Sequence, residues 1–427
     1  MTSPGGTDAA KGEAMLDDYF TRKEILRRHR AGLFGAHLDT YTSMLKEQGF
    51  RAMTVRYQCY LFRLLGRWLE RRRMRIVDID DAVIMEFWRT QRHRNSRVRS
   101  AGSKPLKRLV SHLRARGAVP PQPTAELTEA AALANRFGEY LTERRSLQPV
   151  SVHMASSVAR EFVEGRFGRG QVSLRVLAEG DITRFVLRTA ERLSARTHQT
   201  RMSYLRSFFR FLLEQGEIDV DLVGAVPSVA SRRLAGVPKT LSAEQVKQTL
   251  ASCDRQTSMG RRDYAILLLV AHLGLRACEV ARLQLDDLHW RTGELIVRGK
   301  GSTVEALPLL GDVGKALAIY IEKDRPECEA RRVFMRMRAP VVPIASRGTV
   351  TTIVRDAMNR AGLDVPVRGP HVFRHSLATN MLRGGASMSE IGTVLRHRSP
   401  ATTEIYAKVD FASLRRLAQP WPVGGVR

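Results

Sequence analysis

The chain has 427 residues, which is too long for one ordinary hydrophobic core, so two or three domains are expected. Its 70 lysines and arginines outnumber 43 acidic residues, and the formal net charge of +27 is typical of proteins that bind nucleic acid. The four cysteines lack metal-ligand spacing, which argues against a zinc site or a disulfide framework, and no apolar run approaches the roughly 18 residues of a membrane span. The composition therefore predicts a cytoplasmic protein that works at the nucleoid and has no membrane partner.

Two breaks rich in proline and glycine divide the chain. The first runs from Gly117 to Pro123 and the second from Gly224 to Pro238, and such clusters are typical of linkers. The start of the chain has neither the basic residues nor the apolar stretch of a secretory signal. The predicted organisation is a flexible leader (1–30), an N-terminal helical segment (31–116), a middle helical segment (124–223), a basic linker (224–239) and a C-terminal domain with a tail (240–427).

The two helical segments have one apolar face and one basic face. Apolar side chains recur at helical spacing around Leu65 and again around Phe208, with arginines on the opposite side. A basic helix face is usually just a solvated face. Here arginines outnumber acids heavily from Arg51 to Arg116, which favours contacts to backbone phosphates. The candidate DNA-binding residues are Arg63, Arg67, Arg71, Arg201, Arg206, Arg232 and Arg233.

The two segments also share a rhythm. The order of apolar, acidic and aromatic residues from Trp68 to Trp88 returns between Phe162 and Leu187. We interpret this as a candidate duplicated helical module, although helical bundles resemble one another by pattern alone.

The C-terminal domain is predicted to be mainly α-helical with a small antiparallel β-sheet. Ser242 is a suitable helix cap, and a buried helix over 265–273 should end at Gly274. Two alternating stretches, 294–298 and 304–309, flank a glycine-rich turn and predict a hairpin.

Three further helices are expected toward the C-terminus. One begins at Pro370 and carries His371 and Arg374 on one face near its N-terminal end, where the helix dipole favours an anion. A second is capped by Ser387 and ends near Leu395-Arg396-His397, and a third begins at Ser399-Pro400 and carries Tyr406. Each residue alone is ordinary: His-x-x-Arg is a weak signal, and a lone helix tyrosine usually packs in a core.

Two other interpretations of these motifs fail. The run from His371 to His375 lacks the glutamate of a zinc-protease helix, and Arg374 would repel a metal. The loop around Lys300 has the wrong spacing for a nucleotide-binding loop, and Gly301 stands where a serine or threonine must hold magnesium.

Taken together, six positions give a specific signal. The chain resembles the tyrosine recombinases, the phage-integrase, Xer and Cre-like enzymes, over roughly 240–415, and its middle helical segment is similar in place and character to the core-binding domain of that family. The matching residues, in family order and spacing, are Arg276, Lys300, His371, Arg374, His397 and Tyr406, with Glu279 in support.

The resemblance implies a nucleophile and a base. Tyr406 would attack the scissile phosphate, giving a 3′-phosphotyrosine link and a free 5′-hydroxyl. A tyrosine has an ordinary pKa near 10, so the hydroxyl must lose its proton as it attacks, and His371 is the expected general base.

The resemblance also assigns the supporting roles. Arg276 and Arg374 would clamp the non-bridging phosphate oxygens, and Glu279 would orient Arg276. Lys300 would protonate the leaving 5′-oxygen, while His397 would donate a hydrogen bond to the phosphate. Because the phosphotyrosine bond conserves the energy of the broken link, no cofactor, ATP or metal is implied.

The sequence departs from the family at two places. Arg396 replaces the usual glycine of Leu-Gly-His, which we expect to be tolerated because His397 is kept. Residues 31–116 look helical, whereas many phage integrases carry a small β-rich arm-binding domain there. A short helix over 411–417 would either dock on a neighbouring protomer or pack on its own domain.

The predicted function is site-specific recombination of double-stranded DNA, by a homo-tetramer on DNA or with related recombinases, as the integrase or transposase of a mobile element. Two alternatives stay open. A type IB topoisomerase-like relaxase uses similar residues, and a non-catalytic DNA-binding architectural protein would retain the fold without the reaction.

Overall fold

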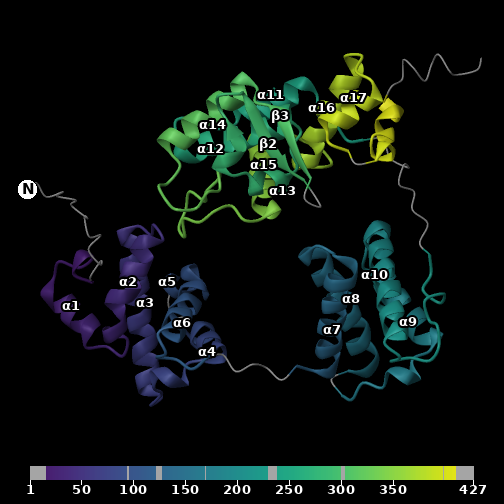
Figure 1. Cartoon of the computed structure of the whole chain (residues 1–427). Coiled ribbons are helices and arrows are strands. Elements are labelled where there is room, and N and C mark those ends of the chain that lie inside the picture. The colour runs from purple at the N-terminus through teal and green to yellow at the C-terminus, as the bar shows by residue number, and fades with distance from the viewer. Residues whose placement is uncertain are drawn as a thin grey trace, which may run out of the picture. The chain divides into compact units, whose positions relative to one another are not determined.

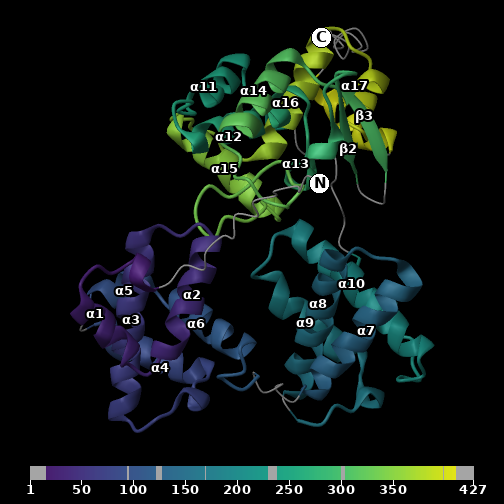
Figure 2. The same ribbon diagram turned by 60° about the vertical axis from the view of Figure 1, so that its left-hand side comes forward.

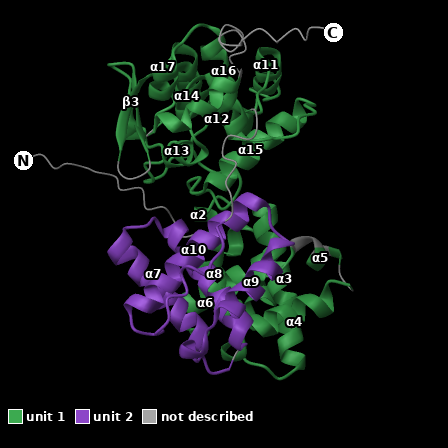
Figure 3. Cartoon of the chain, turned by 90° about the vertical axis from the view of Figure 1, so that its right-hand side faces the viewer, with its two compact units in different colours: residues 1–121, 236–427 green, residues 122–235 purple. Residues whose placement is uncertain are grey.

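The computed structural model describes residues 16–93, 96–121, 127–168, 170–228, 238–299, 303–397 and 399–409 (Figure 1). The chain divides into two compact units, which Figure 3 colours separately. One unit is formed by Met1–Pro121 together with Gly236–Arg427, and the other by Gln122–Ala235. Across the described residues helices dominate, and three short strands form a single sheet, so the predicted fold class is confirmed.

The N-terminal part of the first unit is entirely helical where it is described. Its core is built from interlocking aromatic rings, with Tyr41 edge-to-face on Phe62 and Trp68 edge-to-face on Phe87. Asp80 caps α4 by accepting a hydrogen bond of 2.7 Å from the backbone N–H of Val83. The elements are η1 (Leu16–Asp18), α1 (Lys23–Arg30), α2 (Gly35–Glu47), α3 (Ala52–Arg71), η2 (Ile76–Asp78), α4 (Asp81–Gln91), α5 (Ser96–Ala101) and α6 (Lys104–Ala115).

The second unit is a separate helical bundle in which α7 and α8 pack against each other (Figure 2). Phe137, Phe162, Phe208 and Phe209 fill its centre and are almost fully buried. The elements are α7 (Glu129–Arg145), α8 (Pro149–Phe167), η3 (Leu174–Val176), α9 (Glu179–Ala190) and α10 (Ala195–Glu214).

The two helical regions repeat an order of elements. In the first, the 20-residue α3 leads through the 3₁₀ turn η2 to the 11-residue α4, and in the second, the 19-residue α8 leads through η3 to the 12-residue α9. Each has a T-shaped aromatic pair between the long helix and the one after the turn, Trp68–Phe87 and Phe162–Phe185. A duplicated module predicts this match, and the additional elements η1, α1 and α5 of the first region depart from it.

The C-terminal part of the first unit has its own core around the buried helix α12. Its sheet runs β1–β2–β3, all antiparallel, with Glu294 opposite Pro308 and Arg298 opposite Val304. The predicted hairpin is confirmed, and β1 adds a strand that the sequence did not indicate. The elements are α11 (Ala243–Ala251), α12 (Ser258–His272), α13 (Ala277–Arg282), η4 (Leu285–Asp287), β1 (Leu288–His289), β2 (Glu294–Arg298), β3 (Val304–Pro308), α14 (Gly311–Lys323), α15 (Arg347–Arg360), α16 (Pro370–Arg383), α17 (Met388–Val394), η5 (Pro400–Thr402) and η6 (Glu404–Val409).

Most predicted helix ends are confirmed, but the last helix is not. Ser242 and Ser387 each cap their helices by accepting from the backbone N–H three residues on, and Gly274 follows α12 with a φ of +58°. From Ser399 to Tyr406 the backbone bonds span three residues, so two 3₁₀ segments replace the expected α-helix. The Thr403 side chain, bonded to the ring of His397, anchors this tighter path.

Candidate active site

The turn after α12 positions the first candidate residue. Gly274 lies against Leu395 and Leu377, so closely that a Cβ at this position would approach their methyl groups to about 3 Å. Arg276 then stands at the start of α13, with Glu279 one turn into that helix. The Glu279 carboxylate accepts from the Arg276 backbone N–H at 2.9 Å and from its guanidinium at 2.7 Å. The predicted orienting role of Glu279 therefore has a direct geometric basis.

Arg374 projects from α16 into the same region and is 5% exposed. Its guanidinium donates to the carbonyls of Gly274 and Leu395, which joins the turn after α12 to the end of α17. Burial lowers the pKa of Arg374 to about 9, helped by the nearby charges of Arg276 and Arg396. The side chain therefore remains charged at neutral pH.

Arg396 is a third guanidinium in this cluster. Its backbone has a φ of +54°, a left-handed conformation that glycine adopts without strain, and its side chain is buried. It donates to Glu279 at 3.0 Å, while its carbonyl accepts from Arg276 at 3.3 Å. Arg396, in place of the family's glycine, therefore forms a buried ion pair with Glu279. This pair joins the segment that carries His397 to α13.

The charges in this cluster do not balance. Burial tends to raise the pKa of Glu279, but the hydrogen bond from the Arg276 backbone and the charges of Arg396 and Arg276 outweigh it, so its pKa lies below the ordinary value. Glu279 is therefore ionised and offsets only one of three positive charges. The excess positive charge makes this region suited to an anion such as a phosphate.

Replacing Arg396 by glycine is expected to lower the free energy of unfolding by about 1 kcal/mol. Relief of left-handed strain contributes roughly 1 kcal/mol in favour of glycine, but the lost charge-assisted hydrogen bond to Glu279 costs about 2 kcal/mol. Chemical denaturation of Arg396→Gly, Glu279→Gln and the double variant measures the coupling between the two residues. A more stable Arg396→Gly protein, or additive effects in the double variant, would contradict this account.

Tyr406 lies in η6 next to this cluster and is 1% exposed. Its ring packs with Ala378, Ile391 and Leu395, and its hydroxyl is 2.8 Å from Nδ1 of His375. Burial raises the pKa of Tyr406, while the charges of Arg374 and Arg276 oppose that rise. The phenol is therefore protonated at neutral pH and needs a base before it can act as a nucleophile.

His375 is the site residue that the sequence reasoning missed. Burial lowers its pKa, with the neighbouring His371 and Arg374 adding to the effect, so its ring is neutral at pH 7. A neutral imidazole beside a tyrosine hydroxyl is placed to accept the phenolic proton. The available signal was its position directly after Arg374 and four residues after His371, one turn along the same helix face.

His371 itself is exposed in the first turn of α16. Gly369, with a φ of +139°, immediately precedes that helix and turns the chain into it. Lys300 lies outside the described residues, between β2 and β3. The described side chains that meet around Tyr406 are therefore His375 and His397, with the arginine cluster alongside.

His397 lies parallel to the Tyr406 ring, with centroids 6.4 Å apart, and its Nδ1 is 2.8 Å from the Thr403 hydroxyl. Burial lowers its pKa to about 4, and the charges of Arg374 and Arg276 contribute. In the tautomer in which Thr403 donates to Nδ1, Nε2 carries the proton. That nitrogen is then able to donate a hydrogen bond, as expected of this residue.

The low pKa of His397 predicts a pH-dependent stability. Between about pH 6.5 and pH 4 the unfolded chain takes up a proton on this ring and the folded protein does not, so the free energy of unfolding falls as the pH falls. His397→Asn removes this contribution and should lose less stability over that interval. Thermal unfolding midpoints of both proteins at several pH values measure the difference. Parallel curves would show that the pKa of this histidine is not depressed.

The candidate DNA-binding arginines have different surroundings. Arg63 is half-buried, whereas Arg67 and Arg71 are exposed on α3. In the other unit, Arg201 pairs with Glu161 at 2.6 Å and Arg206 donates to the carbonyls of Val226 and Pro227. Both of these guanidiniums thus have protein partners. Arg232 and Arg233 lie outside the described residues, as does the expected helix over 411–417.

The described residues contain no group of three or more histidine, cysteine, aspartate or glutamate side chains placed to hold a metal ion. Within the same part of the chain, no helix has the length and apolar character needed to cross a membrane.

Comparison with known proteins decides the family. A model of the Phage integrase family matches residues 239–413. The "Putative integrase/recombinase y4rA" of Sinorhizobium fredii (strain NBRC 101917 / NGR234) is 36% identical over 407 residues, covering 95% of this chain and 98% of that protein. The chain belongs to the phage integrase family of tyrosine recombinases. Proteins of the phage integrase family cleave and rejoin DNA.

Xer-type members of the phage integrase family are also similar. The tyrosine recombinase XerD of Listeria monocytogenes serotype 4b (strain F2365) is 29% identical over 282 residues, which cover 65% of this chain and 94% of that protein. The crystal structure of the XerH site-specific recombinase bound to palindromic difH substrate, a post-cleavage complex, aligns with a TM-score of 0.53 at 19% identity, covering 66% of this chain and 83% of that one. The structural match shows that the fold is shared.

Proposed function

We propose that this protein is a site-specific DNA recombinase that cuts and rejoins duplex DNA through a 3′-phosphotyrosine intermediate. The observation that carries the proposal is the Tyr406 hydroxyl, 2.8 Å from a neutral histidine and beside a cluster of three arginines, of which Arg276 and Arg396 share the Glu279 carboxylate and Arg374 is held by two backbone carbonyls. This arrangement combines a nucleophile, a proton acceptor and an excess of positive charge.

In the proposed reaction, the Tyr406 oxygen forms a bond to the scissile phosphorus and the bond to the 5′-oxygen of the next nucleotide breaks. The phenolic proton passes to a histidine: His371 is the base that the family resemblance implies, and His375 is the histidine that contacts the hydroxyl before η6 shifts. Lys300 would give a proton to the departing 5′-oxygen. Attack by the 5′-hydroxyl of a partner strand on the phosphotyrosine then reverses these steps and rejoins the DNA.

The arginines act on the charge that develops during attack. Arg276 has a partly exposed guanidinium, and Arg374 is held rigidly by two carbonyls, so neither needs to reorganise much as charge builds on the phosphate oxygens. Tyr406 is enclosed in its apolar cluster, so η6 must shift before the hydroxyl meets a phosphate. We propose that DNA binding accompanies this shift.

The lengths of the relatives favour a role in a mobile element. The match to XerD uses 94% of that protein but only 65% of this chain, whereas the match to y4rA covers 95% of this chain. The additional length fits the N-terminal helical region of this chain, which we propose is a second DNA-binding module beside the core-binding one. Assembly as a tetramer on DNA, alone or with related recombinases, belongs to the same proposal.

Covalent trapping tests this function. Duplexes selected by the protein from a random-sequence pool are prepared with nicks staggered across the candidate crossover region, so that a cleaved short strand diffuses away and the covalent complex accumulates. Peptide mapping then identifies the attached residue, which we expect to be Tyr406 through a 3′-phosphate. A bound duplex that never yields a covalent complex would favour an architectural protein. Relaxation of supercoiled DNA without any partner site would favour the topoisomerase-like alternative.

A further inference from the structure

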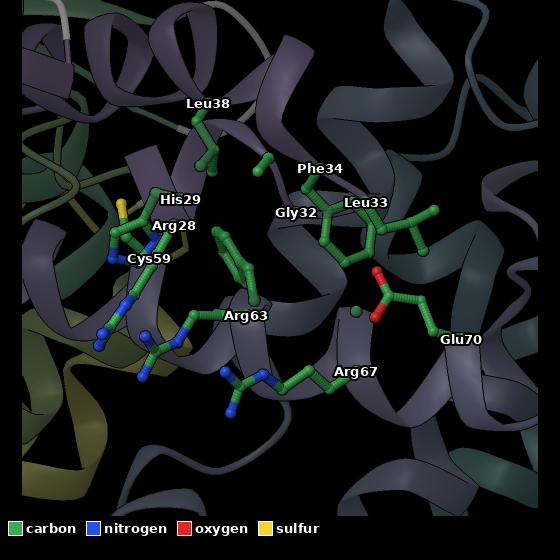
Figure 4. A pocket seen from close by; sticks show the side chains of 13 residues that line it. Arg28, His29, Gly32, Leu33, Phe34, Leu38, Cys59, Arg63, Arg67 and Glu70 are labelled. Atoms are coloured by element: carbon green, nitrogen blue, oxygen red, sulfur yellow. The ribbon is translucent and has the colours of Figure 1, made fainter. Parts of the chain in front are cut away.

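The N-terminal helical part contains a pocket of about 270 Å³ (Figure 4). Its residues are far from Tyr406 in the sequence, and the hydrophobic core beside the pocket is separate from the cluster that contains Tyr406. The lining of the pocket comes from α1, the turn before α2, α2 itself and α3. The apolar part of the lining is Leu33, Phe34, Leu38 and Phe62, and α3 adds the guanidiniums of Arg63 and Arg67. Figure 4 shows Leu33 and Phe34 across the pocket from Arg63.

The basic side of the pocket has uncompensated charge. Arg63 and Arg67 are four residues apart on α3, so two like charges share one helix face, which is unfavourable by itself. Figure 4 shows their guanidiniums close to each other, with Arg28 nearby. Among the described residues, neither Arg63 nor Arg67 forms an ion pair, and the buried Nε of Arg63 has no hydrogen-bond partner. An anion bound here would relieve the repulsion between the two guanidiniums.

The neighbouring polar groups do not supply that anion. Arg28 is paired with Glu24. Figure 4 shows the carboxylate of Glu70 near Leu33, across the pocket from Arg63. His29 is buried at the back of the pocket, and its pKa is lowered by burial and by the charge of Arg63, so it is neutral. The ligand must therefore bring its own negative charge.

We infer that this pocket binds the sugar–phosphate backbone of DNA, with one phosphate on Arg63 and Arg67 and the adjoining deoxyribose against Phe34 and Leu33. The inference rests on the proposed function in that it takes DNA as the ligand. Apolar walls fit a sugar ring, and they strengthen the attraction between the guanidiniums and the phosphate by excluding water.

The surrounding charge favours DNA over a free nucleotide. Residues 51–116 contain 16 arginines and two lysines but only five acidic residues, so the positive field extends far beyond one pocket. The apolar walls also offer few groups that would recognise the edge of a base. A long polyanion such as DNA would be attracted by the extended positive charge. It could also bind against the apolar walls through its backbone, without recognition of a base at this point.

The test measures how DNA binding by the full-length protein depends on salt. The variant Arg63→Gln/Arg67→Gln removes the proposed contact, and Arg89→Gln/Arg116→Gln, at exposed positions of the same region, is the control with the same loss of charge. Fluorescence anisotropy with a random-sequence duplex gives the affinity at several salt concentrations. We expect the pocket variant to bind about tenfold more weakly near 0.15 M salt and to reduce the slope of log K against log salt by about 1, as the loss of one phosphate contact predicts. The control should change affinity by less than about threefold.

Two results would overturn the inference. Equal losses in the two variants would mean that only overall charge matters. If deoxyadenosine monophosphate or inorganic phosphate raises the thermal midpoint of the unaltered protein but not of the pocket variant, and the DNA slopes stay the same, the pocket is a free-phosphate site. Arg63→Lys/Arg67→Lys checks folding, since it keeps the charge and should retain most of the affinity.

The test is separable from the proposed reaction. At saturating protein, the control variant Arg89→Gln/Arg116→Gln should form the covalent complex with nicked duplex as the unaltered chain does. If the unaltered chain forms no such complex, the recombinase proposal fails, and the salt dependence still decides whether the pocket binds DNA.

Discussion

Changing Tyr406 to Phe should abolish the covalent protein–DNA complex and leave DNA affinity within about twofold. The substitution removes the only atom of this side chain that can attack phosphorus, and the ring that fills the apolar cluster stays in place. The loss of one hydrogen bond to His375 is expected to cost about 1 kcal/mol of stability, which leaves the fold intact. Denaturing gels of labelled nicked duplex measure the covalent complex, and anisotropy measures binding.

A matched control separates the hydroxyl from general effects on tyrosines. Tyr320 is also fully buried and also has a hydrogen-bonded hydroxyl, which accepts from the backbone N–H of Met335 at 3.0 Å. Tyr320→Phe should therefore cost similar stability and form the covalent complex at the normal rate. Covalent complex that persists in Tyr406→Phe would move the nucleophile elsewhere.

Changing Arg374 to Gln should slow strand cleavage by about a hundredfold or more. Loss of one charged donor to the developing phosphate charge is worth on the order of 3 kcal/mol. The same change removes the two hydrogen bonds that hold the carbonyls of Gly274 and Leu395 together, so Arg276 and His397 also lose their fixed placement. Arg374→Lys should recover little of the rate, because an ammonium group cannot span both carbonyls as the planar fork does. Single-turnover cleavage of nicked duplex at saturating protein gives the rate directly.

The control for this prediction is another arginine with a two-pronged contact. Arg261 donates to both oxygens of Asp324 at 2.6 Å and belongs to α12, away from the tyrosine. Arg261→Gln should lower stability and leave the cleavage rate of the folded protein unchanged. An equal loss of rate in both variants would mean that Arg374 acts through folding alone.

The parts of the fold that the sequence predicted are those set by neighbouring residues. Caps at Ser242 and Ser387 and the end of α12 at Gly274 depend on contacts within a few residues, and such signals are readable along the chain. The strand β1 has only two residues, too few to show alternation. The 3₁₀ path around Thr403 depends on a hydrogen bond between the Thr403 side chain and His397. The pattern of apolar residues in the sequence does not indicate such a hydrogen bond.

The sequence predicted which residue types make up the candidate site, but not which side chains form hydrogen bonds and ion pairs with one another. The order from Arg276 to Tyr406 indicated a phosphate-directed site, and the model of the family matches that region. The bond between His375 and Tyr406 joins residues 31 apart, and the pair of Arg396 with Glu279 joins residues 117 apart. Such partners are chosen by three-dimensional packing, so a substitution that looked merely tolerable at Arg396 is in fact part of the charged network.

If Tyr406 is the nucleophile that we propose, its enclosure would also protect DNA that the protein binds by chance. A DNA-binding protein with a net charge of +27 would also bind DNA of arbitrary sequence through charge alone. A reactive oxygen that is sealed away during such encounters leaves those strands unbroken. The choice between the correct site and other DNA would then be made at the shift of η6 that exposes Tyr406. Weak and transient contacts with other DNA would not lead to cleavage, however frequent they are.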